Sequence, residues 1–168
     1  MKDEIHWLAG PWPGRLGIAA RPRGGDWLID EIRSWRQAGV RVVVSLLTPD
    51  EEKDLGLEDE EKLARAEGLE FHRLPIPDRG VPSSRTELAD LIHFVEAALQ
   101  RGRHVTIHCR QGIGRSSLVA AALLVGAGQT PDQAFKRVAE VRGVPVFETV
   151  EQRDWVVQLA SELVVAKR

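Results

Sequence analysis

The chain has 168 residues, of which 43% are hydrophobic and 29% are charged, and its formal net charge is −2. These values are typical of an ordinary globular protein with a real core, and we expect residues 1–168 to form a single domain. The small negative charge gives no general attraction to nucleic acid, and no apolar run is long enough to predict a membrane span.

The cellular compartment is predicted from two further features. Residues 1–7 lack the apolar stretch of a secretory signal. The sequence contains one cysteine, Cys109, so no internal disulfide can form within the chain. Both features favour a reducing compartment, and we expect a cytoplasmic protein.

The first hundred residues alternate between strand and helix patterns. Two short β-like pieces, residues 5–8 and 15–19, flank a turn rich in proline and glycine, and a helix capped by Asp26 is expected to follow them. The β-branched run 40–47 predicts a strand that is buried on both faces, and residues 69–74 alternate as a second strand.

Between these two strands, residues 50–61 carry eight acidic side chains, which we interpret as a solvated loop followed by the start of a helix at 60–67. A strand–helix–strand order implies a right-handed crossover and a parallel pair of strands. The sequence therefore predicts an α/β fold with a mostly parallel central sheet flanked by helices.

A proline-rich loop, residues 75–82, directly follows the second strand of this pair and contains Asp78. Loops at the carboxyl ends of parallel strands gather at one edge of the sheet, where ligands bind. A carboxylic acid held there can protonate a departing oxygen. The alternative is that Asp78 merely closes an Asx turn.

The remaining helices carry recognisable start signals. Ser83 or Ser84 is expected to cap a long helix that ends at Gly102, and Thr130 begins a capping box with Gln133. A final helix is expected to begin near Thr149, with Gln152 at its capping-box position.

The most informative segment is a tight loop between a short strand at 104–107 and an apolar helix at 118–125. It contains Cys109 and, six positions later, Arg115. The N–H groups at a helix N-terminus bind anions, and a thiol placed there beside a cation ionises readily. Gly112 and Gly114 are expected to give the loop the positive φ angles that let its N–H groups converge.

Together these features predict a phosphoryl-transfer site. Arg115 supplies a planar fork that can hold two phosphate oxygens, and Cys109 is expected to be the thiolate nucleophile. The phosphate-binding residues are expected to be those of the loop: Arg110, Gln111, Gly112, Ile113, Gly114 and Arg115. The other interpretation of a lone cysteine is a small buried hydrophobe.

The pattern His108-Cys109-x5-Arg115-Ser116 resembles the signature of the cysteine-dependent protein phosphatases. The compact size and the late position of the loop resemble the dual-specificity branch, near its small atypical and kinase-associated members. The resemblance extends roughly from Gly39 to Trp155. It implies a dual-specificity-phosphatase-like fold with the phosphate loop between strand and helix.

The resemblance also implies roles for individual residues. Asp78 takes the place of the general acid, and Ser116 that of the hydroxyl that donates to the departing sulfur. His108 takes a supporting place beneath the phosphate loop. Gln152 is either a capping residue or the glutamine that places the hydrolytic water in some family members. No cofactor is expected, and no metal site, because His104 and His108 have no third ligand at a recognisable spacing.

The expected substrate is a phosphorylated protein or peptide, with phosphotyrosine ahead of phosphoserine and phosphothreonine, and the expected state is a monomer without nucleic acid or membrane partners. Three alternatives stay open. They are an inactive or catalytically weak module that binds phosphorylated partners, a phosphatase for phosphoinositides or RNA 5′-phosphates, and a sulfur transferase of the rhodanese kind.

Overall fold

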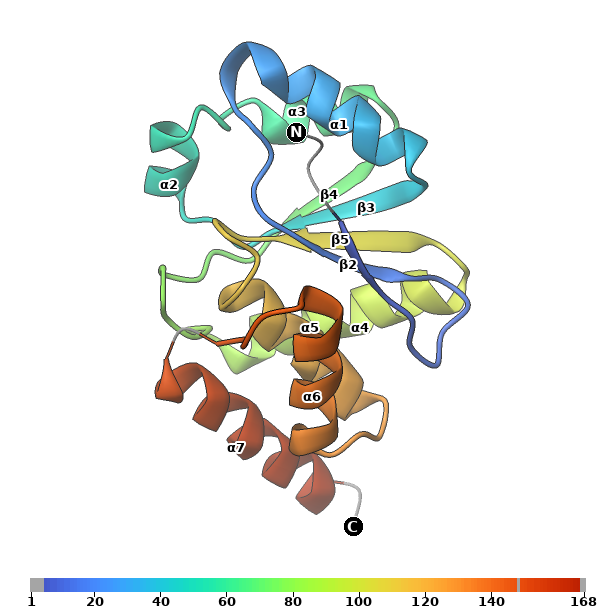
Figure 1. Ribbon diagram of the computed structural model, residues 1–168, viewed down its shortest axis with the longest axis vertical. Coiled ribbons are helices and arrows are strands. Elements are labelled where there is room, and N and C mark those ends of the chain that lie inside the picture. Colours follow the sequence, from blue (N-terminus) through green and yellow to red (C-terminus); the bar gives the residue numbers. More distant parts are fainter. Residues whose placement is uncertain (1–4, 148, 167–168) are drawn as a thin grey trace.

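The computed structural model describes residues 5–147 and 149–166. At its centre lies a five-stranded sheet with the strand order β1-β2-β5-β3-β4 (Figure 1). The strands are β1 (His6–Leu8), β2 (Leu16–Ala19), β3 (Val40–Ser45), β4 (Glu70–Arg73) and β5 (His104–His108). β1 runs antiparallel to β2, and every other neighbouring pair is parallel, as predicted for β3 and β4.

Helices cover both faces of the sheet (Figure 1). The helices on one face are α1 (Leu28–Gln37) and α3 (Glu60–Ala66). Those on the other side are α4 (Arg85–Gln100), α5 (Arg115–Gly126), α6 (Pro131–Arg142) and α7 (Val150–Ala166). α5 packs between the sheet and helices α6 and α7, so every residue from 115 to 125 is buried. This explains why its sequence is apolar on nearly all sides.

The alternation of side chains along the central strands divides the core in two. Val42 and Val44 of β3 belong to the cluster under α4 and α5, whereas Val43 belongs to the cluster under α1 and α3. The same alternation in β5 sends Ile107 toward α5 and His108 toward Trp35 of α1. The residue that follows, Cys109, packs in the α5 cluster at the end of the strand.

The carboxyl ends of the parallel strands meet at one edge, as expected. Beyond β3, the N–H of Leu46 donates to the carbonyl of His108, at 3.0 Å. The segment after β4 continues this ladder, because Ile76 N donates to Leu46 O at 3.1 Å. The loops that contain Cys109 and Asp78 are therefore neighbours in space.

Two sequence interpretations need correction. The helix start expected at 60–67 is confirmed by α3, but the residues before it are not simply a solvated loop, because α2 (Pro49–Asp54) forms there, and the carboxylates of Glu51 and Glu60 are buried. Asp26 does not cap α1, because it lies inside a short 3₁₀ helix, η1 (Gly25–Trp27). The predicted caps of the later helices are confirmed: Ser84 caps α4, and Thr130 and Gln133 form a capping box at α6. None of the described helices combines the length and apolarity needed to cross a bilayer.

Candidate active site

Cys109 lies at the base of the loop between β5 and α5, where it is 1% exposed. The backbone N–H of Gly112 donates to its sulfur across 3.2 Å. Gly112 has φ +70°, and a Cβ there would meet the carbonyl carbon and oxygen of Ala19 at 2.7 Å. Both the backbone angle and the close approach therefore require glycine. Gly114 has φ −88°, so the prediction of a positive φ at this second glycine was wrong.

The carbonyl groups of the loop are all engaged on its outer side. From Cys109 to Ile113 their partners are, in order, His108 Nδ1, Arg21 N, Arg142 Nη2, Arg142 Nε and Phe147 N. In a planar trans peptide the N–H points opposite to the carbonyl, so the N–H groups of residues 110–114 face the other way. Among the residues that the structure describes, only the Gly112 N–H has an acceptor, the Cys109 sulfur. The loop thus presents a set of unpaired donors around the sulfur, which is an anion-binding arrangement.

Arg115 is the first residue of α5, and its side chain is 1% exposed. One edge of its guanidinium is held by Glu51, with Nη1–Oε1 at 2.6 Å and Nη2–Oε2 at 2.9 Å. Nη1 also donates to Ile76 O at 2.8 Å, and Nη2 to Asp78 Oδ1 at 3.2 Å. Nε has no partner within the described part of the chain. Four of the five N–H donors of the Arg115 guanidinium thus have partners, and the fifth, on Nε, has none among the described residues. Nε and Nη2 form the edge of the guanidinium that contacts Asp78.

Glu51 and Arg115 shift each other's ionisation toward the charged pair. Burial alone would raise the pKa of Glu51, but hydrogen bonds from Arg115 and from the Thr48 backbone, with the nearby guanidinium charge, bring it below 4.5 overall. Burial alone would likewise lower the pKa of Arg115, but Glu51 and the charges of Cys109 and Asp78 raise it overall. The fork is therefore fixed in place and stays charged at any physiological pH.

We expect Glu51→Gln to destabilise the fold at neutral pH by on the order of 3 kcal/mol, because a buried guanidinium would lose its charged partner. The native pKa of Glu51 lies below its ordinary value of 4.5, so its stabilisation is complete above that pH and is lost as pH falls through the native value. Urea unfolding of the wild type and of Glu51→Gln across pH 3–7 measures the free energy of unfolding of each protein. The difference between the two should become smaller as the pH falls.

The matched control is Glu52→Gln, because Glu52 is the next residue of α2 and pairs with Arg73 instead of Arg115. It should change stability by less than about 1 kcal/mol. Equal destabilisation by both substitutions would contradict the claim that the Glu51–Arg115 pair stabilises the fold. So would a loss of stability in Glu51→Gln that is the same at every pH.

The backbone of the proline-rich loop aims Asp78 at Arg115. Gly80 N donates to Pro77 O at 2.8 Å, which closes a tight turn with Asp78 and Arg79 at its centre. Arg79 has φ +61°, a conformation that costs a non-glycine residue of order 1–3 kcal/mol. The Asp78 carboxylate contacts the guanidinium while its side chain is 48% exposed, so it lies between Arg115 and solvent. Because a backbone hydrogen bond closes this turn, the turn itself does not depend on the Asp78 side chain.

A buried acid–base pair lies under the loop. His108 is 0% exposed and Glu60 is 1% exposed, and His108 Nε2 lies 2.7 Å from Glu60 Oε2. Its other ring nitrogen faces the Cys109 carbonyl at 3.4 Å. His108 therefore contacts the phosphate loop as the resemblance implies, but its stronger partner is a carboxylate at the start of α3.

The two remaining predicted residues also lie at this edge. The Ser116 hydroxyl is buried in the first turn of α5 and has no hydrogen-bond partner among the described residues. Gln152 is buried in the first turn of α7, and its Nε2 donates to Gly80 O in the Asp78 loop at 3.0 Å. Its backbone N–H donates to the Thr149 Oγ1 at 3.1 Å, as expected at the start of a capped helix, so both interpretations of Gln152 retain a structural basis.

Sequence reasoning missed three charged residues of this site: Glu51, Glu60 and Arg142. The two glutamates lie in a run of eight acids, which composition alone assigns to solvent. A signal for Glu51 was present, because Thr48-Pro49-Asp50-Glu51 has the cap, the N1 proline and the N3 carboxylate of a capping box. No local pattern marks Arg142, because an arginine in the last turn of a helix is ordinary.

Comparisons with known proteins agree with this geometry. Residues 17–129 match the family model described as "Polymorphic toxin system, DSP-PTPase phosphatase". Cyclin-dependent kinase inhibitor 3 of Sus scrofa is 35% identical over 98 residues, which cover 57% of this chain and 46% of that protein. The match thus spans less than half the length of this curated relative.

Solved structures show the same fold. Kinase-associated phosphatase with its catalytic cysteine replaced by serine is 23% identical, with a TM-score of 0.89 over 98% of this chain and 97% of its own. Tk-PTP in its active form is 26% identical, with a TM-score of 0.76 over 94% of this chain and 96% of its own. Because the family model spans well over half of the sequence and includes the loop from Cys109 to Arg115, the chain belongs to the cysteine-dependent phosphatases of the dual-specificity and tyrosine-phosphatase branch.

Proposed function

We propose that this protein hydrolyses phosphomonoesters through a cysteinyl-phosphate intermediate. One observation supports the proposal above all others: the Cys109 sulfur lies inside a loop whose carbonyls are all bound on the outer side and whose N–H groups face inward. Such a cradle binds a tetrahedral oxyanion, and the sulfur lies where the phosphorus would be attacked.

Substrate binding requires a rearrangement at Arg115. Glu51 holds one edge of the guanidinium, while Nε and one Nη2 proton form the other edge. A phosphate that takes two hydrogen bonds from this second edge displaces the Asp78 carboxylate, which now contacts Nη2. Asp78 is then released toward the ester oxygen, where a general acid is needed.

The first chemical step forms a phosphorus–sulfur bond and breaks the ester phosphorus–oxygen bond. The Cys109 thiolate attacks in line, and protonated Asp78 gives its proton to the leaving oxygen. In the second step water attacks the phosphorus and gives a proton to the Asp78 carboxylate, and the sulfur leaves as thiolate. Arg115 and the loop N–H groups stabilise the oxygens throughout.

Ser116 and Gln152 are assigned to the second step. A buried hydroxyl without a partner costs about 1–3 kcal/mol, and that of Ser116 is in this condition. We assign it to donate to the sulfur as the thiolate leaves. We assign Gln152 to orient the attacking water, and its contact with the Asp78 loop through Gly80 O supports this assignment.

The substrate class that we propose is a phosphorylated protein or peptide, with phosphotyrosine preferred over phosphoserine and phosphothreonine. The family description, which joins dual-specificity and tyrosine phosphatases, supports a phosphorylated protein as the substrate, and the order of preference is our proposal. We further propose that residues 1–168 act as one domain, because the described elements pack on the two faces of a single sheet, and that the protein acts as a monomer.

The proposed acid is tested by Asp78→Asn with two monoesters, one releasing a good aryl leaving group and one an alkyl alcohol. We expect kcat/KM, which reports the first step, to fall by about 10²–10⁴-fold on the alkyl ester, which needs the proton, and by much less on the aryl ester. Steady-state kinetics with both substrates gives the comparison.

The control is Asp90→Asn, an exposed aspartate on α4, which should leave both rates unchanged. Equal losses on the two esters would contradict the acid assignment. A wild-type protein that binds phosphopeptides but hydrolyses neither ester, or that transfers sulfur from thiosulfate instead, would contradict the proposed function itself.

A further inference from the structure

Arg142 connects the far end of α6 to the phosphate loop. It is a half-buried residue in the last turn of that helix, and its Nε donates to Gly112 O at 2.7 Å. Its Nη2 contacts Gln111 O at 3.5 Å, and its Nη1 donates to His6 Nε2 of β1. One guanidinium thus joins α6, β1 and the two central peptides of the loop.

These two contacts fix the direction of two N–H groups. The Gly112 carbonyl and the Ile113 N–H belong to one planar peptide and point in opposite directions, as do the Gln111 carbonyl and the Gly112 N–H. A donor that holds the carbonyls outward therefore holds both N–H groups inward. The Gly112 N–H shows the result, because it ends on the Cys109 sulfur at 3.2 Å.

The peptides that Arg142 holds are also those with the most freedom to turn. Gly112 adopts φ +70°, and glycine has low barriers to other backbone conformations. A peptide that flipped here would aim a carbonyl oxygen at the bound phosphate and remove a donor. A guanidinium bonds a carbonyl more strongly than a neutral donor does, and its planar shape reaches adjacent peptides at once.

We propose that Arg142 is a positioning residue that keeps the phosphate loop in its oxyanion-binding conformation by holding the carbonyls of Gln111 and Gly112. This inference rests on the proposed function, because it assigns a task in the same site. It predicts that Arg142 contributes to oxyanion binding and to catalysis without contacting the substrate.

The competing explanation is purely structural. A cation near a helix C-terminus interacts favourably with the helix dipole, and Arg142 also packs against β1 through His6. Under that explanation, substitution lowers the unfolding temperature while the folded protein keeps its normal affinity for oxyanions. The two explanations therefore differ in what the folded variant binds.

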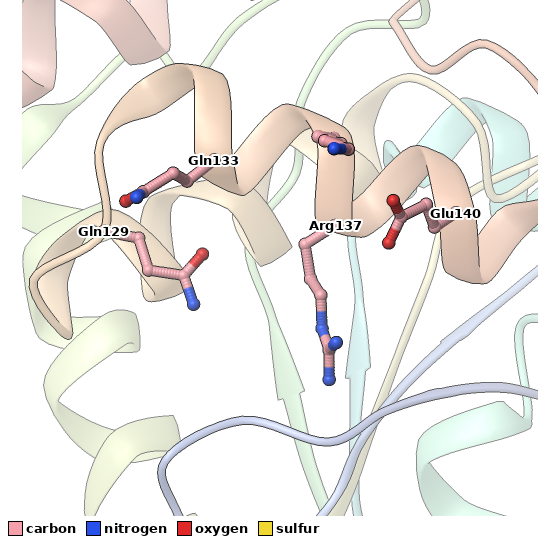
Figure 2. A pocket seen from close by; sticks show the side chains of 5 residues that line it. Gln129, Gln133, Arg137 and Glu140 are labelled. Carbon is pink, nitrogen blue, oxygen red and sulfur yellow. The ribbon is translucent and has the colours of Figure 1, made fainter.

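The experiment compares the wild type with Arg142→Ala, Arg142→Lys and a control, Arg137→Ala. Arg137 lies on the same helix and lines a pocket with Gln129, Gln133, Lys136 and Glu140. Figure 2 shows how the Arg137 side chain lies relative to Gln129, Gln133 and Glu140. It donates to the Ala9 carbonyl and contacts neither Gln111 nor Gly112 in the described structure. Each protein is assayed with p-nitrophenyl phosphate, titrated with inorganic tungstate as the oxyanion probe, and melted thermally.

We expect Arg142→Ala to lower kcat/KM by about 10- to 100-fold and to weaken tungstate binding by about tenfold. Arg142→Lys should recover part of both losses, because an ammonium can reach one of the two carbonyls. Arg137→Ala should match the wild type in activity and tungstate affinity. If Arg142→Ala does not fold, intermediate losses in a normally stable Arg142→Lys protein support the same conclusion.

Wild-type tungstate affinity and kcat/KM in both Arg142 variants, with or without a lower melting temperature, would overturn the inference and leave the proposed function intact. An inactive wild type that also fails to bind tungstate would instead contradict the proposed function.

Discussion

Replacing Cys109 by serine is expected to reduce hydrolysis of p-nitrophenyl phosphate by on the order of 10⁴-fold or more. A serine hydroxyl is far less nucleophilic than a thiolate, so the variant lacks the nucleophile that the first step requires. Oxyanion binding should persist, because the cradle consists of backbone N–H groups and Arg115. The Gly112 N–H can donate to a hydroxyl oxygen as it does to the sulfur.

The measurement combines turnover with tungstate titration and thermal unfolding of the same preparation. Because Cys109 is the one cysteine of the sequence, a thiol titration of the variant should also fall to zero. Hydrolysis within about tenfold of the wild-type rate by a protein that carries no thiol would contradict the nucleophile assignment.

Arg115→Lys should produce the second large effect, a loss of about 10²–10³-fold in kcat/KM. Lysine keeps the charge beside Glu51, but an ammonium cannot hold Glu51, the Ile76 carbonyl and two phosphate oxygens together as the guanidinium does. Steady-state kinetics and circular dichroism melting separate the catalytic loss from the loss of stability.

The conservative control is Arg33→Lys, an exposed arginine of α1 that pairs with Glu67, and it should leave kcat/KM unchanged. Arg115→Ala should in addition destabilise the protein by about 3–5 kcal/mol, because it leaves the buried Glu51 carboxylate without its cation. Wild-type kinetics for Arg115→Lys would show that a point charge is enough for phosphate binding and catalysis. This result would contradict the proposal that Arg115 binds two phosphate oxygens at once.

The elements nearest the phosphate loop were predictable because their signals are local. A β-branched strand, a loop with two glycines and an apolar helix follow one another within residues 104–126, and each has its own propensity. Thr130 and Gln133 predicted the start of α6 for the same reason, and the structure confirms their capping box. The parallel pairing of β3 and β4 followed from the handedness of their crossover.

The charged residues that contact Arg115, His108 and the phosphate loop from other elements, namely Glu51, Glu60 and Arg142, could not be predicted from local signals. Which carboxylate of residues 50–61 turns inward depends on where Arg115 and His108 lie, and both are distant in sequence. Glu60 differs from its exposed neighbours only through its tertiary contact, whereas Glu51 also has the capping-box pattern, which does not show that its carboxylate is buried against Arg115. Arg142 contacts the loop because α6 packs against α5, which no local pattern reveals.

The error at Gly114 has a physical explanation. The residue before α5 already has a helical φ, so the chain enters the helix without a left-handed step there. The single reversal of the loop is at Gly112, where a Cβ would meet the backbone of Ala19 at 2.7 Å. A sequence with two glycines in five residues does not distinguish these positions.

The central claim, that the phosphoryl group passes through Cys109, is tested most directly by trapping the intermediate. Asp78→Asn protein, in which hydrolysis of the intermediate is slowed, is mixed with p-nitrophenyl phosphate and stopped rapidly in alkaline denaturant. Peptide mass spectrometry then locates any phosphoryl group. We expect one phosphoryl group on the peptide that contains Cys109, rising with the release of the first equivalent of p-nitrophenolate. Release of product while Cys109 carries no phosphoryl group at any time, or phosphorylation of a different residue, would contradict the account.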